Sequence, residues 1–223
     1  MNKPRKLKLS LIGCLLILIQ FSCGFSTEKR RPPALEKRLE ERGIKIISDA
    51  EILEKVTAEG EQLTKLADSL LYKKLDSLLK KNAPIEASYF CAAYDAFLHD
   101  SLRTRYNTLV QRVALTEAPE LKNPFEKNLI EAYAYSQAAG DRLDNNVQFY
   151  ANKDSLLFNK PIFLADQLCL RCHGGSTTIP KELAARALED NKSIRMKSDT
   201  LNQLKGMWSV RFSKKELVKN FNN

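Results

Sequence analysis

Residues 169–173 read Cys-Leu-Arg-Cys-His, which is the Cys-x-x-Cys-His pattern of covalent c-type haem attachment. The chain has five cysteines and two histidines in 223 residues, so random placement would give about 0.001 such pentapeptides. Two thiols separated by two residues can each form a thioether with one haem vinyl group, and the next imidazole can ligate the iron. The pattern therefore predicts haem c and its iron as the cofactor, bound by Cys169, Cys172 and His173.

Other chemistries use the same pair of cysteines. The pair could form a disulfide or half of a zinc site, but a zinc site needs a second Cys or His pair that the chain does not offer. A redox Cys-x-x-Cys motif has no need of His173. The pattern thus favours haem c, provided that the chain reaches a compartment where haem is attached.

The N-terminus predicts export. Residues 1–8 contain four basic side chains and no acid, and an apolar run follows over residues 11–21, as in a secretory signal. The run ends before Cys23-Gly24, so we interpret residues 1–22 as a lipoprotein-type signal and Cys23 as the lipidated first residue of the mature chain. Gln20 stands where such signals usually have an aliphatic residue, so ordinary cleavage near Ser22 or an uncleaved anchor are the alternatives. We expect a bacterial lipoprotein that is membrane-anchored and faces the periplasm or the cell surface.

Composition gives the expected domain organisation. Residues 23–47 are predicted to be a lipid-anchored tether, residues 48–213 the haem domain and residues 214–223 a C-terminal tail. The formal net charge is +9, of which the signal carries four. The other basic residues alternate with acids, and no basic stripe interleaved with aromatic residues indicates nucleic-acid binding.

Hydrophobic spacing predicts the main elements. A capping box from Ser48 to Glu51 begins a long helix over residues 48–81. A second apolar segment, residues 83–98, could also be helical. Further helices are expected over residues 125–137 and 180–188, and strands over residues 111–114, 147–151, 155–163 and 206–212.

One cysteine of the exported chain has no assigned partner. Cys91 could be a small buried hydrophobic residue, which is how free cysteine usually behaves. It could also be the second axial ligand of the iron, since thiolate ligates haem. The alternatives for the second axial ligand are His99, Met207 or an open position.

Five segments carry a resemblance to a known family. They are Ser88–Cys91, the turn Lys122–Glu126, the strand end Lys160–Ile162, the motif Cys169–Gly174 and the strand Gly206–Val210. In this order they resemble a family of exported c-type haem proteins of unknown function, which occur alone or as sensor regions of bacterial signalling proteins. The resemblance implies an α+β, PAS-like fold: an antiparallel sheet flanked by helices, with a long N-terminal helix. It also implies that His173 and Cys91 are the two axial ligands.

Two features depart from the family pattern. Lys122 stands where the family has arginine, and residues 179–205 are rich in helix formers. In addition, no kinase, cyclase or methyl-acceptor domain follows Phe221, so we expect any signal to pass to another protein.

Three functions are consistent with these features. The first is a haem-based sensor, in which a diatomic gas or a redox change displaces Cys91. The second is an electron-transfer cytochrome, in which both ligands stay bound and a redox protein is the partner. The third, which we favour least, is a peroxidase-like enzyme with His99 as its acid–base group.

Overall fold

The structure, a computed structural model, describes residues 32–43, 46–106, 108–150, 153–189 and 199–221. The chain divides into two units, Met1–Ile46 and Ile47–Asn223. The predicted signal and the predicted lipidation site Cys23 lie outside the described residues. Within the described ranges, no helix is both long and apolar enough to cross a membrane.

The first unit contains one described helix, α1 (Pro33–Glu40). Pro33 occupies the first helical position, where its missing N–H removes no hydrogen bond. The segment predicted to be a tether therefore includes a two-turn helix.

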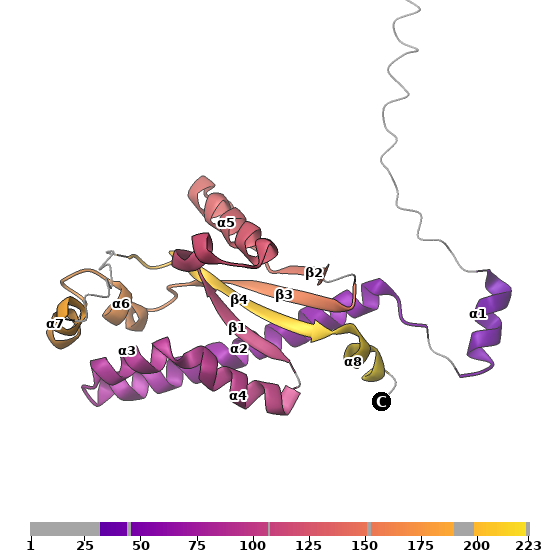
Figure 1. The fold of residues 1–223 in the computed structure, drawn as a ribbon, viewed down its shortest axis with the longest axis horizontal. Helices are drawn as coiled ribbons and strands as arrows, with labels where there is room; N and C mark the ends of the chain where they lie inside the picture. Colours follow the sequence, from indigo (N-terminus) through magenta and orange to yellow (C-terminus); the bar gives the residue numbers. More distant parts are fainter. Residues whose placement is uncertain (1–31, 44–45, 107, 151–152, 190–198, 222–223) are drawn as a thin grey trace, which may run out of the picture. The chain divides into compact units, whose positions relative to one another are not determined.

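The second unit is built on a four-stranded sheet (Figure 1). The strands lie in the order β1 (Leu109–Ala114), β4 (Leu204–Ser213), β3 (Ser155–Phe163) and β2 (Asn146–Tyr150). Every neighbouring pair is antiparallel. This arrangement confirms the predicted α+β class and antiparallel sheet. All four predicted strands are present: the strand over residues 155–163 has the predicted ends, and the described ends of the others differ by at most two residues.

The long N-terminal helix is also confirmed, as α2 (Asp49–Lys80). Its start is a complete capping box: the Ser48 hydroxyl accepts a hydrogen bond of 3.2 Å from the Glu51 amide, and the Glu51 carboxylate accepts one of 2.7 Å from the Ser48 amide. Gly60 lies against the Phe158 ring of β3 so closely that no Cβ would fit. The helix therefore packs directly on the sheet.

The apolar segment over residues 83–98 forms two helices instead of one. α3 (Pro84–Ala92) ends just before Ala93, and α4 (Tyr94–Tyr106) continues beyond the predicted end. Figure 1 shows α2, α3 and α4 on one face of the sheet. Their buried side chains form one core with the inward residues of that face, among them Val56, Leu63, Tyr94, Leu98, Phe158, Trp208 and Val210.

The opposite face is covered by η1 (Leu115–Glu120) and α5 (Pro124–Ala139). α5 begins at the predicted turn, where the Asn123 side chain accepts a hydrogen bond of 3.1 Å from the Phe125 amide. It ends at Gly140, whose φ of 81° favours glycine. A second, smaller core fills this face, with Val113, Ala118, Ile130, Tyr133, Leu204 and Met207 buried.

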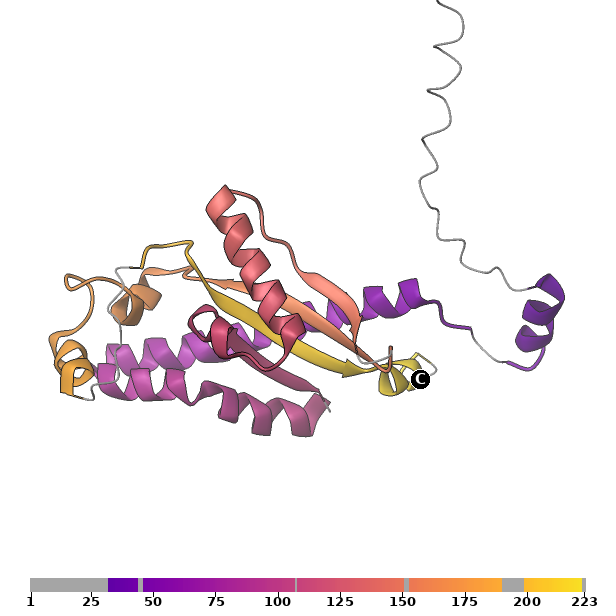
Figure 2. The same ribbon diagram turned by 45° about the horizontal axis from the view of Figure 1, so that its top comes forward.

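Three short helices complete the unit. α6 (Gln167–His173) and α7 (Lys181–Glu189) lie at the end of the sheet where β3 ends and β4 begins, as Figures 1 and 2 show. α8 (Lys214–Lys219) follows β4 within the segment predicted to be a tail, and its Leu217 is buried in the larger core.

Candidate haem site

The Cys-x-x-Cys-His motif forms α6, a helix of two turns. Asp166 caps it: its carboxylate accepts a hydrogen bond of 2.8 Å from the Leu168 amide, and its carbonyl accepts one of 3.0 Å from the Cys169 amide. Residues three and four apart share a helix face, so the helical turn places Cys172 and His173 on the same side as Cys169. Both thiols are free and half-buried. This is the placement that attachment to one haem requires.

Hydrogen bonds fix the connection between the motif and the sheet. The Leu164 amide donates to the Gln203 carbonyl (3.0 Å), and the Asn202 amide donates to the Leu164 carbonyl (2.9 Å). The two bonds tie the chain that enters α6 to the chain that enters β4. The position of α6 relative to the sheet is therefore held from both strands.

His173 ends α6, and its surroundings favour the neutral imidazole. Burial lowers the pKa of His173, the positive charges of Lys205 and Arg112 lower it further, and Asp199 opposes them. The His173 carbonyl accepts a hydrogen bond of 3.2 Å from the Asp199 amide, and Asp199 pairs with Lys205. Neutral imidazole is the form that ligates iron.

The pKa values of the two motif thiols are raised, chiefly by burial. For Cys172 the pKa reaches about 11, and negative charge on Cys91 and on Cys169 contributes to the rise. Cys91 is therefore an electrostatic neighbour of Cys172, although 81 positions separate them in the chain. The unassigned cysteine therefore interacts electrostatically with the haem motif in the folded chain.

Cys91 lies in the last turn of α3 as a free, half-buried thiol. Arg112 of β1 reaches it: one guanidinium nitrogen lies 2.6 Å from the Cys91 carbonyl oxygen and the other 3.5 Å from its Sγ. Arg112 also acts on the pKa of His173. A single cationic side chain thus lies within electrostatic reach of both predicted axial ligands.

Asp95 holds Arg112 in this place. Its Oδ1 accepts hydrogen bonds of 3.1 Å from the Arg112 side chain and from the Arg112 backbone amide. Burial by itself would lower the pKa of Arg112, but the negative charges of Cys91 and Asp95 outweigh burial and raise it. The guanidinium therefore stays charged beside the Cys91 sulfur.

The other predicted candidates for the second iron ligand are Met207 and His99. Met207 is fully buried in the core beneath α5. Met207 comes directly before Trp208 in β4, and Trp208 pairs with Arg112 of β1. Because successive side chains of a strand point to opposite faces, Met207 points to the face opposite that of Trp208 and Arg112. The side chain of His99, in α4, lies outside the described residues. Of Cys91 and Met207, only Cys91 contributes to the pKa of a motif residue.

Sequence reasoning missed Arg112 and Asp95. A charged residue in the middle of a strand otherwise suited to a core is a signal that could have found Arg112. Asp95 follows Cys91 by four positions, which is one helical turn, but the break at Ala93 conceals that relation. Lys122, which stands where the resemblance implies an arginine, is exposed beside the cap of α5.

The donor set fits haem c. Two thiols share a helix face, a neutral imidazole follows them, and a third thiol with a charged hydrogen-bond donor lies near. Thiolate and imidazole are both established haem ligands.

Comparisons with known proteins place this chain in a family. The Tll0287-like family model matches residues 49–213. The crystal structure of the cyanobacterial haem protein Tll0287 matches with 20% sequence identity and a TM-score of 0.45, over 75% of this chain and 98% of that one. Among curated proteins, none matches the chain at a significant level. Because the family model spans most of the chain, from the start of α2 to the end of β4, the chain belongs to the Tll0287-like family.

Proposed function

We propose that this protein is a membrane-tethered c-type haem protein that acts as a redox or gas sensor. The observation that carries the proposal is the contact between Cys91 and the half-buried guanidinium of Arg112, because Cys91 acts on the pKa of Cys172 and Arg112 acts on that of His173. The membership of a family that includes a haem protein supports the cofactor. The antiparallel sheet with flanking helices is consistent with the PAS-like fold that the sequence predicts.

In this proposal each site residue has a defined task. The thiols of Cys169 and Cys172 would hold the haem covalently, each by adding its S–H across one vinyl double bond. His173 and Cys91 would ligate the iron. Haem contributes an iron that changes between two oxidation states and binds diatomic gases.

The residues around Cys91 explain how a change at the iron could reach the rest of the domain. Arg112 is hydrogen-bonded to Cys91 and Asp95 at the ends of two helices, while its own backbone belongs to β1. Release of the Cys91 sulfur would leave the guanidinium with a different charge beside it. A movement of Arg112 would then act on β1, which pairs with the central strand β4. The proposal includes a partner protein that reads this change.

Spectra of the haem-loaded protein test the proposal. We expect covalent haem, with thiolate ligation in the ferric state that is lost in Cys91→Ser. We also expect the ferrous protein to bind carbon monoxide or nitric oxide promptly, with loss of the Cys91 bond. Cys169→Ser should reduce covalent attachment and is the matched control. Spectra that are six-coordinate in both states and unchanged by either gas would exclude gas sensing at this site.

Electron transfer is the second candidate function. It is favoured by the partial exposure of α6, in which neither motif cysteine is fully buried. A haem bound there would have an edge near solvent, as exchange with a redox protein requires. Rapid reduction and reoxidation with unchanged axial ligands would support this function over sensing.

The membrane tether is a separate part of the proposal and has its own test. The predicted lipidation of Cys23 should place the protein in the membrane fraction. We expect Cys23→Ser to move it to the soluble fraction while leaving covalent haem intact. Membrane association that Cys23→Ser does not change would contradict the lipid anchor.

A further inference from the structure

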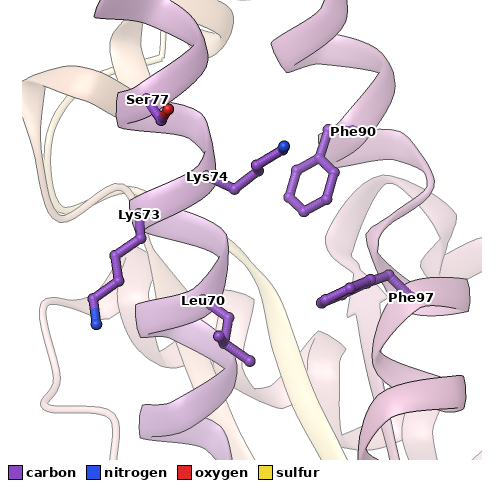
Figure 3. A pocket seen from close by; sticks show the side chains of 6 residues that line it. All are labelled: Leu70, Lys73, Lys74, Ser77, Phe90 and Phe97. Carbon is purple, nitrogen blue, oxygen red and sulfur yellow. The ribbon is translucent and has the colours of Figure 1, made fainter.

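A groove runs between α2 and the α3–α4 pair, apart from the residues of the candidate haem site (Figure 3). Its volume is about 440 Å³, and its lining residues are Leu70, Lys73, Lys74, Ser77, Phe90 and Phe97. Small-molecule sites usually have volumes of about 300–1,000 Å³. The groove is therefore large enough for a small organic ligand.

One wall of the groove is aromatic and held in place. The ring centroids of Phe90 and Phe97 lie 5.9 Å apart, and Tyr94 contacts both rings from behind at 5.5 and 5.8 Å. Tyr94 is fully buried, and its hydroxyl donates a hydrogen bond of 2.6 Å to the Ala67 carbonyl of α2. This bond joins the helices on both sides, so the apolar wall is formed before any ligand arrives. Phe97 is nevertheless 43% exposed.

The opposite wall is cationic. Lys74 points across the gap toward Phe90, with its Nζ 5.9 Å from the ring centroid, and the Ser77 hydroxyl lies one turn further along α2 (Figure 3). Lys73 points away from the two rings in the same view. None of the six lining residues is acidic. An ammonium, a hydroxyl and an apolar floor together suit a molecule with an anionic head and a hydrocarbon body.

We propose that this groove binds a small amphiphilic monoanion, such as a medium-chain carboxylate. The carboxylate would accept hydrogen bonds from Lys74 and Ser77, and the chain would lie along Leu70, Phe97 and Phe90. The α2 side of the groove, from Leu70 to Ser77, is about 10 Å long at 1.5 Å per residue. That length suits a short alkyl chain, whereas a partner protein would bury about 800 Å² of this surface.

The test is calorimetric titration of the full haem-loaded chain, carrying Cys23→Ser so that no lipid competes. Sodium octanoate and its uncharged analogue octanamide are the probes. We expect one octanoate per chain and at least about tenfold weaker binding of octanamide, because the amide cannot pair with the ammonium. Lys74→Met should weaken octanoate binding about tenfold and leave octanamide binding unchanged. Phe97→Ser should weaken both.

Lys65→Met is the matched control, since Lys65 is an exposed lysine of α2 outside the groove. It should leave both affinities unchanged. Circular dichroism of each variant checks that it is folded, and hydrogen exchange should show protection by octanoate in residues 70–77 and 90–97.

Three results would overturn the proposal. One is octanoate binding that Lys74→Met and Lys65→Met change equally. Another is the absence of octanoate binding together with binding of an acidic amphipathic peptide. The third is a dimer in sedimentation that Phe97→Ser converts to a monomer, since a second copy would then cover the groove.

Discussion

The guanidinium of Arg112 donates a hydrogen bond of 2.6 Å to the carbonyl oxygen of Cys91 and thereby joins β1 to the last turn of α3. The same group lies 3.5 Å from the Cys91 sulfur and is held from its other side by Asp95. This contact is a polar link between the sheet and the helix that carries the third thiol.

Replacing Arg112 tests this contact. Arg112→Gln should lower the free energy of unfolding by about 2 kcal/mol, because the Cys91 carbonyl and Asp95 lose a charged donor. In the haem-loaded protein it should also weaken thiolate ligation by Cys91. Arg112→Lys should restore part of the stability and keep the charge. Urea unfolding and absorption spectra measure the two effects.

The control is Arg211→Gln. Arg211 is an exposed arginine of β4, in the same sheet, and its guanidinium lies over the Tyr150 ring. We expect its replacement to change the free energy of unfolding by no more than about 1 kcal/mol and to leave the spectrum unchanged. Equal effects at Arg112 and Arg211 would contradict the special role of Arg112.

Gly60→Ala should destabilise the protein although alanine is the better helix former. A Cβ at this position would lie 2.6 Å from Cδ1 of Phe158, in the middle of the α2–β3 contact. Overpacking of this kind costs about 1–3 kcal/mol, which exceeds the gain of about 1 kcal/mol in helix propensity. Thermal unfolding should show a lower midpoint.

Two further variants separate packing from helix propensity. Gln62→Ala, at an exposed position of the same helix, should leave the midpoint almost unchanged. Phe158→Leu should make Gly60→Ala less harmful than it is in the parent chain, because the ring that occupies the space is gone. A gain in stability from Gly60→Ala alone would show that α2 does not pack on β3 in this way.

The folded protein should lose stability at high pH, because Tyr133 is buried. Burial raises the pKa of Tyr133 to about 12, while an unfolded tyrosine titrates near 10. Between these values the unfolded chain has lost the proton that the folded chain still holds, so the stabilising contribution is complete below pH 10 and is lost as pH rises to about 12. The loss should be about 1–2 kcal/mol.

Tyr133→Phe should make this alkaline loss smaller. At neutral pH the variant should be about 1 kcal/mol less stable, because the hydroxyl donates a hydrogen bond of 3.0 Å to the Asp144 carbonyl. Tyr135→Phe is the control, since Tyr135 is in the same helix but 77% exposed. Urea unfolding from pH 8 to pH 11.5 distinguishes the two, and parallel curves for both variants would refute the burial of Tyr133.

Cys172 should react slowly with alkylating agents in the haem-free chain. Its pKa of about 11 leaves far less thiolate at pH 8 than in an ordinary thiol. We expect alkylation at Cys172, followed by mass spectrometry of its peptide, to be at least about tenfold slower in the folded chain than in urea. The folded-chain rate should continue to rise with pH up to about 11. Equal rates in the folded and unfolded chains would contradict the burial of this thiol.

Local features were predictable because their causes are local. The capping box at Ser48 and the 3.6-residue spacing that follows it gave the long helix α2. The alternating segment before Ser213 gave β4. The break between α3 and α4 was missed, because the apolar pattern continues through Ala93 and only packing against α2 and β1 decides where the helix turns.

The same distinction between local and tertiary causes applies to the candidate site. The motif Cys169–His173 is contiguous, so thiol spacing and the adjacent imidazole could be read directly. The role of Cys91 as the second iron ligand stayed one alternative among several, since no residue near it in the sequence indicates which side chains surround it in the fold. Arg112 and Asp95 were not predicted at all, because each acquires its partner only when β1 packs against the α3–α4 pair.

By itself, the sequence determined the haem attachment motif, the class of fold and the position of most helices and strands, because these depend on residues within a few turns of one another. Only the tertiary structure decided that Cys91 lies beside Arg112, 21 positions further along the chain, and that Met207 points to the other core. The physical reason is that sheet order and strand register determine which face a side chain occupies, and these arise from contacts between distant segments.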